Sequence, residues 1–229
     1  MKSLDKVTSI NPATQLAIAT YTRNTLSEVN DKIIKAKAAH NVWKTLSFEE
    51  RAKPLRKLAS LLLKDLDVHA ELITKEMGKT IGQARKEVEK CALVCNYYAD
   101  NAEDLLQDVS VITEARKSYV TFQPLGVILA VMPWNFPFFQ VIRFAAPALM
   151  AGNTGILKHA SNVQGCAFIL ESLFDKAGFP EGVFTNLNVS SEQIESIIEN
   201  KHIAAVTLTG SESAGRSIAA LAGKHLKKT

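Results

Sequence analysis

The sequence has few cysteines, few aromatic residues and no disulfide or metal-binding pattern. Of its 229 residues, 3 are cysteines and 7% are aromatic. Cys91, Cys95 and Cys166 are too few for a disulfide framework, and their spacing matches no zinc motif. We therefore expect reduced thiols in a cytoplasmic protein that binds no metal.

Long apolar runs are also missing. The first ten residues contain no continuous apolar stretch of the kind that a secretory signal needs. The most apolar stretch, 125–132, is followed at once by Pro133 and Pro137, whereas a membrane helix needs about 20 apolar residues. We therefore expect no secretory signal and no membrane partner.

A strong charge of one sign is absent as well. The net charge is +4, and the lysines at 224, 227 and 228 crowd the last six residues. The rest of the chain is near neutral and offers no basic face with interleaved aromatic residues, which excludes a nucleic-acid binder as the leading interpretation.

Composition and length fit a folded protein. The chain is 47% apolar and 22% charged, which are globular averages. At about 150 residues per domain, the length predicts one large domain or one and a half.

Hydrophobic spacing divides the chain near residue 108. Before it, apolar residues recur at helical spacing, and Gly78 stands where a helix would end. The predicted helices span 27–40, 48–66, 68–77 and about 81–106.

After residue 108 the pattern is that of strands alternating with helices. A hairpin is predicted from strands at 109–113 and 118–123. Four buried strands follow, at 126–131, 154–158, 183–186 and 204–209, separated by helices at 138–150, 163–177 and 192–199 and followed by one at 214–222. This α/β alternation predicts a parallel sheet covered on both faces, with ligands at the carboxyl ends of its strands.

Polar residues follow three of these strands. The string Pro133-Trp-Asn-Phe-Pro137 forms a stiff turn in which Asn135 can donate its amide to an oxyanion, a contribution of roughly 3 to 4 kcal/mol in acyl transfer. A helix cap is the interpretation that local sequence alone favours for Asn135.

The turns after the second and fourth strands carry weaker signals. Lys158 and Ser161 can hold a ribose or phosphate, although a solvated lysine and a helix-capping serine explain such a string more often. Gly210 and Ser211 can approach a pyrophosphate at a helix N-terminus, and an ordinary strand-to-helix turn fits them about as well.

Together, the motifs of the whole chain resemble the aldehyde dehydrogenase superfamily, and in particular the succinate semialdehyde dehydrogenase branch. The strings that carry the resemblance are Asn11-Pro-Ala-Thr14, Pro133-Trp-Asn-Phe-Pro137, Ala151-Gly-Asn153 leading to Lys158, Ala177-Gly-Phe-Pro-Glu-Gly-Val183, and Thr209-Gly-Ser211 with Gly215-Arg216.

The resemblance implies a truncated aldehyde dehydrogenase fold. Residues 1–108 would form an N-terminal arm and helices that pack on the nucleotide domain, and 109–124 the hairpin of an oligomerisation arm. Residues 125–229 would form an incomplete NAD(P)-binding domain of Rossmann type with four of five parallel strands. The fifth strand would follow Thr229, and the catalytic domain would be absent.

Roles for single residues also follow from the resemblance. Asn135 would be the catalytic side-chain donor to the oxyanion. Lys158 would lie at the adenosine ribose. The residues implied to bind the cofactor are Met132, Pro133, Trp134, Asn135, Lys158, Ser161, Gly210 and Ser211.

Ser161 bears on the choice of cofactor. Many NAD-preferring relatives carry a glutamate here, which would repel the 2′-phosphate of NADP. Ser161 can instead hydrogen-bond this phosphate while Lys158 neutralises it, so we expect NADP to be accepted, alongside NAD.

Arg143 bears on the substrate. It lies eight residues after Asn135 in an otherwise apolar helix and can face the same cavity, or reach solvent as an ordinary surface arginine. In the resemblance it clamps the remote carboxylate of succinate semialdehyde.

The implied reaction is oxidation of an aldehyde to an acid, but its nucleophilic cysteine and glutamate base lie downstream in the family. Cys91, Cys95 and Cys166 fit buried structural thiols better. We expect the chain alone to be inactive, and a homo-oligomer at full length. The alternative is a truncated, non-catalytic nucleotide-binding or interaction module. Two departures stand out: His159 replaces a common proline, and 185–191 has no glycine.

Overall fold

The computed structural model describes residues 5–229. Its strands are β1 (Lys6–Ile10), β2 (Ala17–Thr22), β3 (Val109–Ser110), β4 (Tyr119–Val120), β5 (Val127–Met132), β6 (Thr154–His159), β7 (Phe184–Asn186) and β8 (Ile203–Leu208). Its helices are α1 (Leu26–Trp43), α2 (Phe48–Lys64), α3 (Leu66–Met77), α4 (Ile81–Leu105), α5 (Phe139–Met150), α6 (Gln164–Ala177), α7 (Ile194–Glu199) and α8 (Glu212–Lys224), with short 3-10 turns η1 (Ser161–Val163) and η2 (Ser191–Gln193).

Local sequence explains where several helices begin and end. Capping boxes start α1 at Thr25 and α2 at Ser47, each with a glutamate three residues later. Gly78 ends α3 in the left-handed region, with φ of 81°, as its position in the sequence predicted.

The central sheet has four parallel strands in the order β7-β6-β5-β8. Nearly every side chain of β5 and β6 is buried, which matches the predicted sheet with two covered faces. Val131 pairs with Lys158 on one side and Leu208 on the other, so the turns after these three strands begin at one edge of the sheet.

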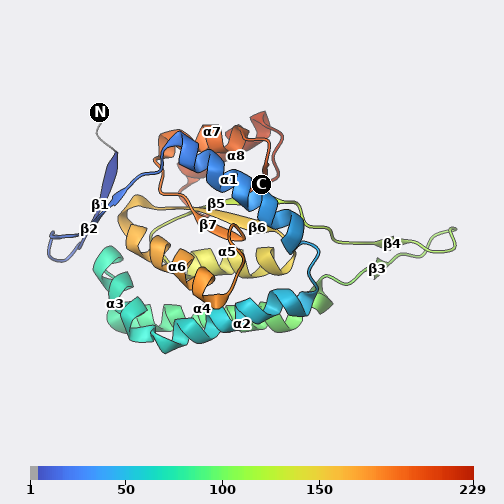
Figure 1. Ribbon diagram of the computed structural model, residues 1–229, viewed down its shortest axis with the longest axis horizontal. Coiled ribbons are helices and arrows are strands. Elements are labelled where there is room, and N and C mark those ends of the chain that lie inside the picture. The colour runs from blue at the N-terminus through green and yellow to red at the C-terminus, as the bar shows by residue number, and fades with distance from the viewer. Residues whose placement is uncertain (1–4) are drawn as a thin grey trace.

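Helices cover both faces of this sheet (Figure 1). On one face, α1, α7 and α8 enclose a core with the sheet that includes Ile33, Ile197 and Ala222. On the other face lie α5 and α6, and α2 and α4 pack outside them to form a further layer. Helix α1 contacts the sheet directly, since Thr154 Oγ1 donates to Ala36 O at 3.1 Å.

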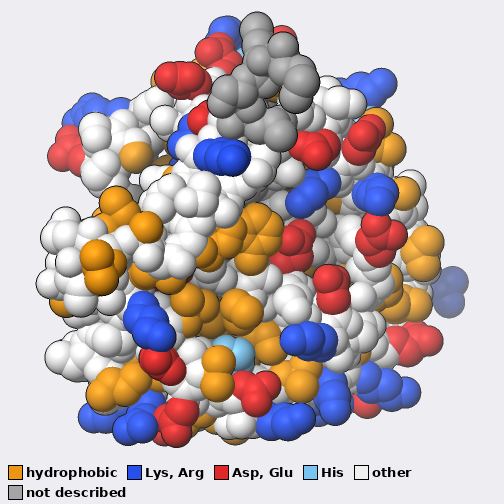
Figure 2. All heavy atoms as spheres, turned by 60° about the vertical axis from the view of Figure 1, so that its left-hand side comes forward, with side chains coloured by type: hydrophobic (Ala, Val, Ile, Leu, Met, Phe, Trp, Pro, Cys, Tyr) orange, Lys and Arg blue, Asp and Glu red, His pale blue; other side chains and the backbone are white. Residues whose placement is uncertain are grey.

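The hairpin formed by β1 and β2 was not predicted. Only Ser9 is buried in its two strands, so the segment lacks the apolar alternation that marks a strand in sequence. The hairpin packs against α3 and η1. Figure 2 brings this side forward and shows hydrophobic side chains gathered in a hollow, which is lined by Tyr21, Val68, Leu72 and Phe168 among others.

The second hairpin is shorter than predicted. Its paired strands are 109–110 and 119–120 rather than 109–113 and 118–123. Nearly all of its side chains are exposed, and a two-stranded ribbon with no core contact supports little pairing. Figure 1 shows it projecting from the body on the side opposite to β1 and β2.

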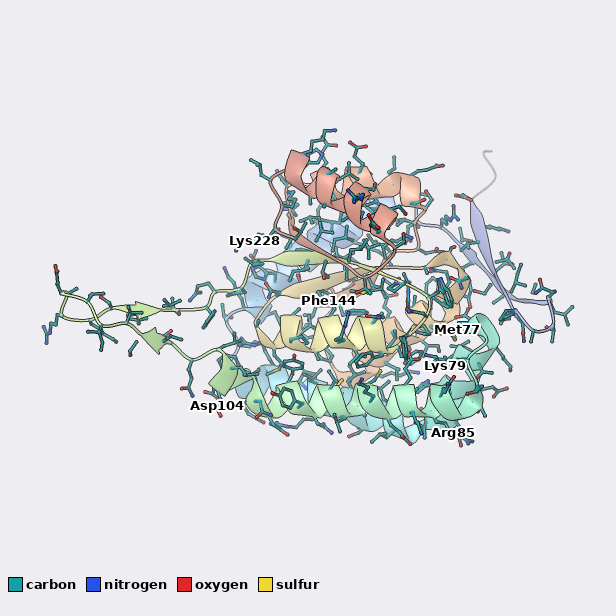
Figure 3. The ribbon with its side chains drawn as sticks, turned by 180° about the vertical axis from the view of Figure 1, so that it is seen from behind. Met77, Lys79, Arg85, Asp104, Phe144 and Lys228 are labelled. Carbon is teal, nitrogen blue, oxygen red and sulfur yellow. The ribbon has the colours of Figure 1, made fainter. Side chains whose placement is uncertain are left out.

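The outer edge of β8 carries one more parallel contact. Val206 N donates to Lys228 O at 2.8 Å, and Ala205 pairs with Lys228 as an isolated bridge. Figure 3 labels Lys228 beside this strand. Within residues 5–229, no helix combines the length and hydropathy required to cross a bilayer.

Candidate functional site

The loop after β5 presents its side chains outward. Trp134 is 51% exposed, Phe136 is 44% exposed and Asn135 is exposed between them. Asn135 does not cap α5, because the start of this helix has no side-chain cap of the usual kind. The local interpretation of Asn135 as a helix cap is therefore wrong.

The carboxylate of Glu87, a buried residue of α4, caps the start of α5 instead. Glu87 Oε1 accepts hydrogen bonds from the backbone nitrogens of Phe138 at 2.9 Å and Phe139 at 3.0 Å. The positive end of the α5 dipole favours a carboxylate at this position. The side chain of Glu87 is fully buried.

Lys79 joins this carboxylate to the loop. Its Nζ pairs with Glu87 Oε2 and donates to the backbone oxygen of Asn135 at 3.0 Å. The same ammonium lies 3.6 Å from the centre of the Phe136 ring. Figure 3 labels Lys79 between the beginnings of α4 and α5.

His159 ties the loop to the neighbouring strand. Its Nε2 lies 2.8 Å from Pro137 O, while its Nδ1 accepts from the backbone nitrogen of Ala160 at 2.9 Å. Burial lowers its pKa to about 4, so the ring is neutral near pH 7. A neutral ring with the proton on Nε2 satisfies both contacts.

Lys158 and Ser161 lie in the turn after β6. Lys158 is half-buried, and its pKa is lowered by burial and secondly by the positive charge of Arg23. Ser161 is exposed as the first residue of η1, where the flanking cap residue Ala160 makes no side-chain cap bond. Ser161 is therefore not a helix cap, and that alternative interpretation is wrong.

The turn after β8 is open. Gly210 and Ser211 are exposed, and the Ser211 hydroxyl accepts from Ala214 N at 3.3 Å, which caps α8. Thr209 N donates to Val131 O at 3.1 Å and keeps this turn next to the loop after β5.

Arg143 is exposed on α5, and its side chain reaches the turn after β8. Its Nη2 donates to Thr209 Oγ1 at 3.1 Å. It lines a groove of about 450 Å³ between α5 and β8, together with Met132 and Gln140. Asn135 is not among the residues that line this groove, so within residues 5–229 the groove brings Arg143 next to Met132 but not to Asn135.

Two buried glutamates, Glu76 and Glu87, were missed from the sequence, and His159 was noted only as a departure from the family pattern. Glu76 accepts from Gly165 N and Cys166 N at 2.9 Å each, so it caps α6 as Glu87 caps α5. A signal existed, because both glutamates stand on the apolar faces of their helices, where an ionised side chain needs a partner.

The three cysteines are buried inside helices α4 and α6. All three are buried, and burial raises the pKa of Cys95 to about 12 and those of Cys91 and Cys166 well above the ordinary value. None fits a reactive thiolate. In the described part of the chain, no three metal-binding side chains cluster.

Comparison with known proteins agrees with this architecture. A probable succinate-semialdehyde dehydrogenase (NADP(+)) from Synechocystis sp. is 51% identical over 223 residues, which cover 97% of this chain and 49% of that protein. A succinate-semialdehyde dehydrogenase (NADP(+)) from Mycobacterium leprae is 46% identical over 97% of this chain and 50% of its own length. The chain thus spans about half the length of these curated relatives.

Solved structures share the fold. The succinic semialdehyde dehydrogenase of Streptococcus pyogenes, solved in complex with NADP+, superposes with a TM-score of 0.95 at 40% identity, over 97% of this chain and 49% of that one. A NAD-dependent benzaldehyde dehydrogenase from Corynebacterium glutamicum gives 0.92 at 27% identity, over 100% and 50%. The family model described as the aldehyde dehydrogenase family matches residues 1–229. The chain belongs to the aldehyde dehydrogenase family.

Proposed function

We propose that this chain is the nucleotide-binding half of an NAD(P)-dependent aldehyde dehydrogenase that oxidises succinate semialdehyde to succinate. The observation that carries the proposal is the convergence at one sheet edge of the exposed Asn135, the cation Lys158 and the open N-terminus of α8. The relatives named for succinate semialdehyde and NADP(+) support the choice of substrate and cofactor.

The residues present fit a nicotinamide nucleotide. Among residues 5–229, Lys158 has no carboxylate that offsets its burial, which suits an anionic partner such as a 2′-phosphate. Helix α8 offers unblocked backbone N–H groups to a pyrophosphate, near Gly210 and Ser211. Met132, Pro133 and Trp134 would line the nicotinamide side of the same nucleotide.

When bound, the nucleotide supplies a hydride acceptor. The part of this chain is to bind and orient it and to offer the Asn135 amide to the oxyanion that develops on the aldehyde carbon's oxygen. The nucleophile and the general base would come from the remaining half found in the relatives. We also propose a cytoplasmic, homo-oligomeric enzyme, with region boundaries near residues 108 and 124, in which the hairpin of β3 and β4 serves assembly.

The cofactor is tested by binding to the chain itself. Titration calorimetry with NADP+ and NAD+ is expected to give measurable binding of NADP+. Ser161→Glu should weaken NADP+ more than NAD+ because a carboxylate repels the 2′-phosphate. Binding of NAD+ with no binding of NADP+ would contradict the NADP part of the proposal.

The substrate is tested at Arg143 in the full-length enzyme. Arg143→Ala is expected to raise KM for succinate semialdehyde by far more than KM for an uncharged aldehyde, because an arginine fork binds a carboxylate bidentately. Equal effects on both aldehydes would argue against the clamp. Loss of the Arg143 contact to Thr209 alone would not distinguish the two aldehydes.

A non-catalytic nucleotide-binding or interaction module is the second candidate. Its support is that all three cysteines are buried and that burial raises the pKa of each thiol. We expect no aldehyde oxidation above background from this chain by itself. Turnover by the full-length protein decides for the enzyme, and its absence decides for the module.

A further inference from the structure

The loop from Pro133 to Pro137 is held mainly through its backbone, while the side chains of Trp134 and Asn135 are exposed. Three side chains hold it through four hydrogen bonds: Lys79 contacts Asn135 O, His159 contacts Pro137 O, and Glu87 contacts Phe138 N and Phe139 N directly after the loop.

Lys79 is the unusual member of this group. Its side chain is 7% exposed and its partner Glu87 is 0% exposed, so two charges are removed from water together. A buried ion pair adds little net stability over an apolar pair of the same size. The pair therefore needs another explanation, and its contacts with the loop supply one.

The ammonium of Lys79 makes three contacts with different parts of the same feature. It meets the carboxylate that caps α5, the carbonyl of Asn135 and the face of the Phe136 ring. Its own backbone is fixed, because Gly78 ends α3 in a left-handed conformation and Lys79 N contacts Met77 Sδ at 3.0 Å.

We propose that Lys79, through its pair with Glu87, is a positioning residue: it fixes the position of the Asn135 backbone so that the Asn135 amide side chain can reach the oxyanion. This inference rests on the proposed function for its catalytic consequence. A shift of about 1 Å in a catalytic group is enough to cost about 100-fold in rate, so a modest displacement of this loop matters.

The test replaces the pair without leaving a buried charge. In Lys79→Met combined with Glu87→Gln, the glutamine oxygen still accepts from Phe138 N and Phe139 N, while the contact to Asn135 O is lost. Lys79→Arg keeps the charge and serves as the rescue variant. Lys90→Met is the matched control, because Lys90 lies on α4 three residues after Glu87 and 4.3 Å from the Phe139 ring, but contacts none of the loop carbonyls in the described part of the chain.

Two readouts separate positioning from folding. In the full-length enzyme, the double variant is expected to lower kcat by about 10- to 100-fold with KM for NADP+ changed by less than about threefold. Lys79→Arg should recover most of kcat, and Lys90→Met should match the wild type. In this chain, acrylamide quenching should report the loop through Trp134, since Trp43 is only 2% exposed; the double variant should change the quenching constant.

The outcomes are distinct. A folded double variant with wild-type kcat and wild-type quenching overturns the inference and leaves the proposed function intact. A wild-type enzyme that binds nucleotide but oxidises no aldehyde overturns the proposed function, and the Trp134 quenching still decides whether Lys79 positions the loop. A double variant that loses its circular dichroism signal is replaced by Lys79→Gln, whose shorter side chain keeps a hydrogen-bond donor beside Glu87 but falls short of Asn135 O. A lower kcat with unchanged KM then supports positioning, and a wild-type kcat overturns the inference.

Discussion

Helices α5, α6 and α8 each follow a strand of the sheet and start near its carboxyl edge, but their N-termini differ. Those of α5 and α6 are closed by the protein itself, through the carboxylates of Glu87 and Glu76. That of α8 is capped only by the Ser211 hydroxyl and is exposed. A helix N-terminus attracts an anion, so a closed one serves structure and an open one is available to a ligand.

The largest expected effect comes from opening α5. Glu87→Ala leaves Lys79 as a buried charge without its partner and two backbone N–H groups without acceptors, and should lower the free energy of unfolding by about 3 to 5 kcal/mol. Urea unfolding measures it. The exposed Glu89→Ala on the same helix is the control and should change stability by less than about 0.5 kcal/mol. Equal losses of stability in both variants would show that Glu87 does not stabilise the N-terminus of α5.

His159, which contacts the loop before α5, should make the free energy of unfolding depend on pH. Its folded pKa of about 4 lies below the ordinary value of 6.5, so below pH 6.5 the unfolded chain binds a proton that the folded chain does not. Its contribution is complete above pH 6.5 and is lost as the pH falls toward 4, by roughly 3 kcal/mol. Unfolding curves of His159→Gln should show a flatter dependence than the wild type over this interval; parallel curves would contradict a neutral buried imidazole.

Sequence patterns predicted the exposed N-terminus of α8 better than the capped N-termini of α5 and α6. The strand-helix alternation and the Gly210-Ser211 turn follow from local spacing, and the parallel sheet was confirmed. The two capping glutamates were missed because each joins segments far apart in the sequence: Glu76 contacts residues 165 and 166, and Glu87 contacts residues 138 and 139. A charged residue on an apolar helix face signals such a partner without saying which one it is.

The same reason explains two of the errors, one at a strand end and one at a hairpin. Asn135 was a plausible helix cap until Glu87 from another helix satisfied the same backbone groups. The hairpin of β1 and β2 is stabilised where it packs against α3 and η1, and its own sequence has too little apolar alternation to predict it. The catalytic and cofactor roles of the site residues stay predictions.

Glycines on the two sides should respond differently to a methyl group. A Cβ on Gly165 would lie 2.8 Å from both Glu76 Oε1 and Tyr21 OH, whereas the nearest atom to a Cβ on Gly210 is 3.7 Å away. Gly165→Ala should therefore destabilise by about 1 to 3 kcal/mol through overpacking around Glu76. Gly210→Ala should stay within about 0.5 kcal/mol in thermal unfolding. Similar changes in the free energy of unfolding for both variants would mean that the residues around Glu76 move aside at little cost.

The smallest expected change in stability carries the sharpest test of the open helix. Asp and Ser cap helices about equally well, so Ser211→Asp should change the free energy of unfolding by only a few tenths of a kcal/mol, whereas Ser211→Ala should cost about 1 kcal/mol. Ser211→Asp nevertheless places a carboxylate at the α8 N-terminus and makes it resemble those of α5 and α6. If a pyrophosphate binds there, the aspartate variant should bind NADP+ at least about tenfold more weakly, because like charges repel at short range, and the alanine variant should keep most of the affinity. Unchanged binding by both variants would place the pyrophosphate elsewhere, since a helix end already closed by a carboxylate cannot accept a second anion on the same N–H groups.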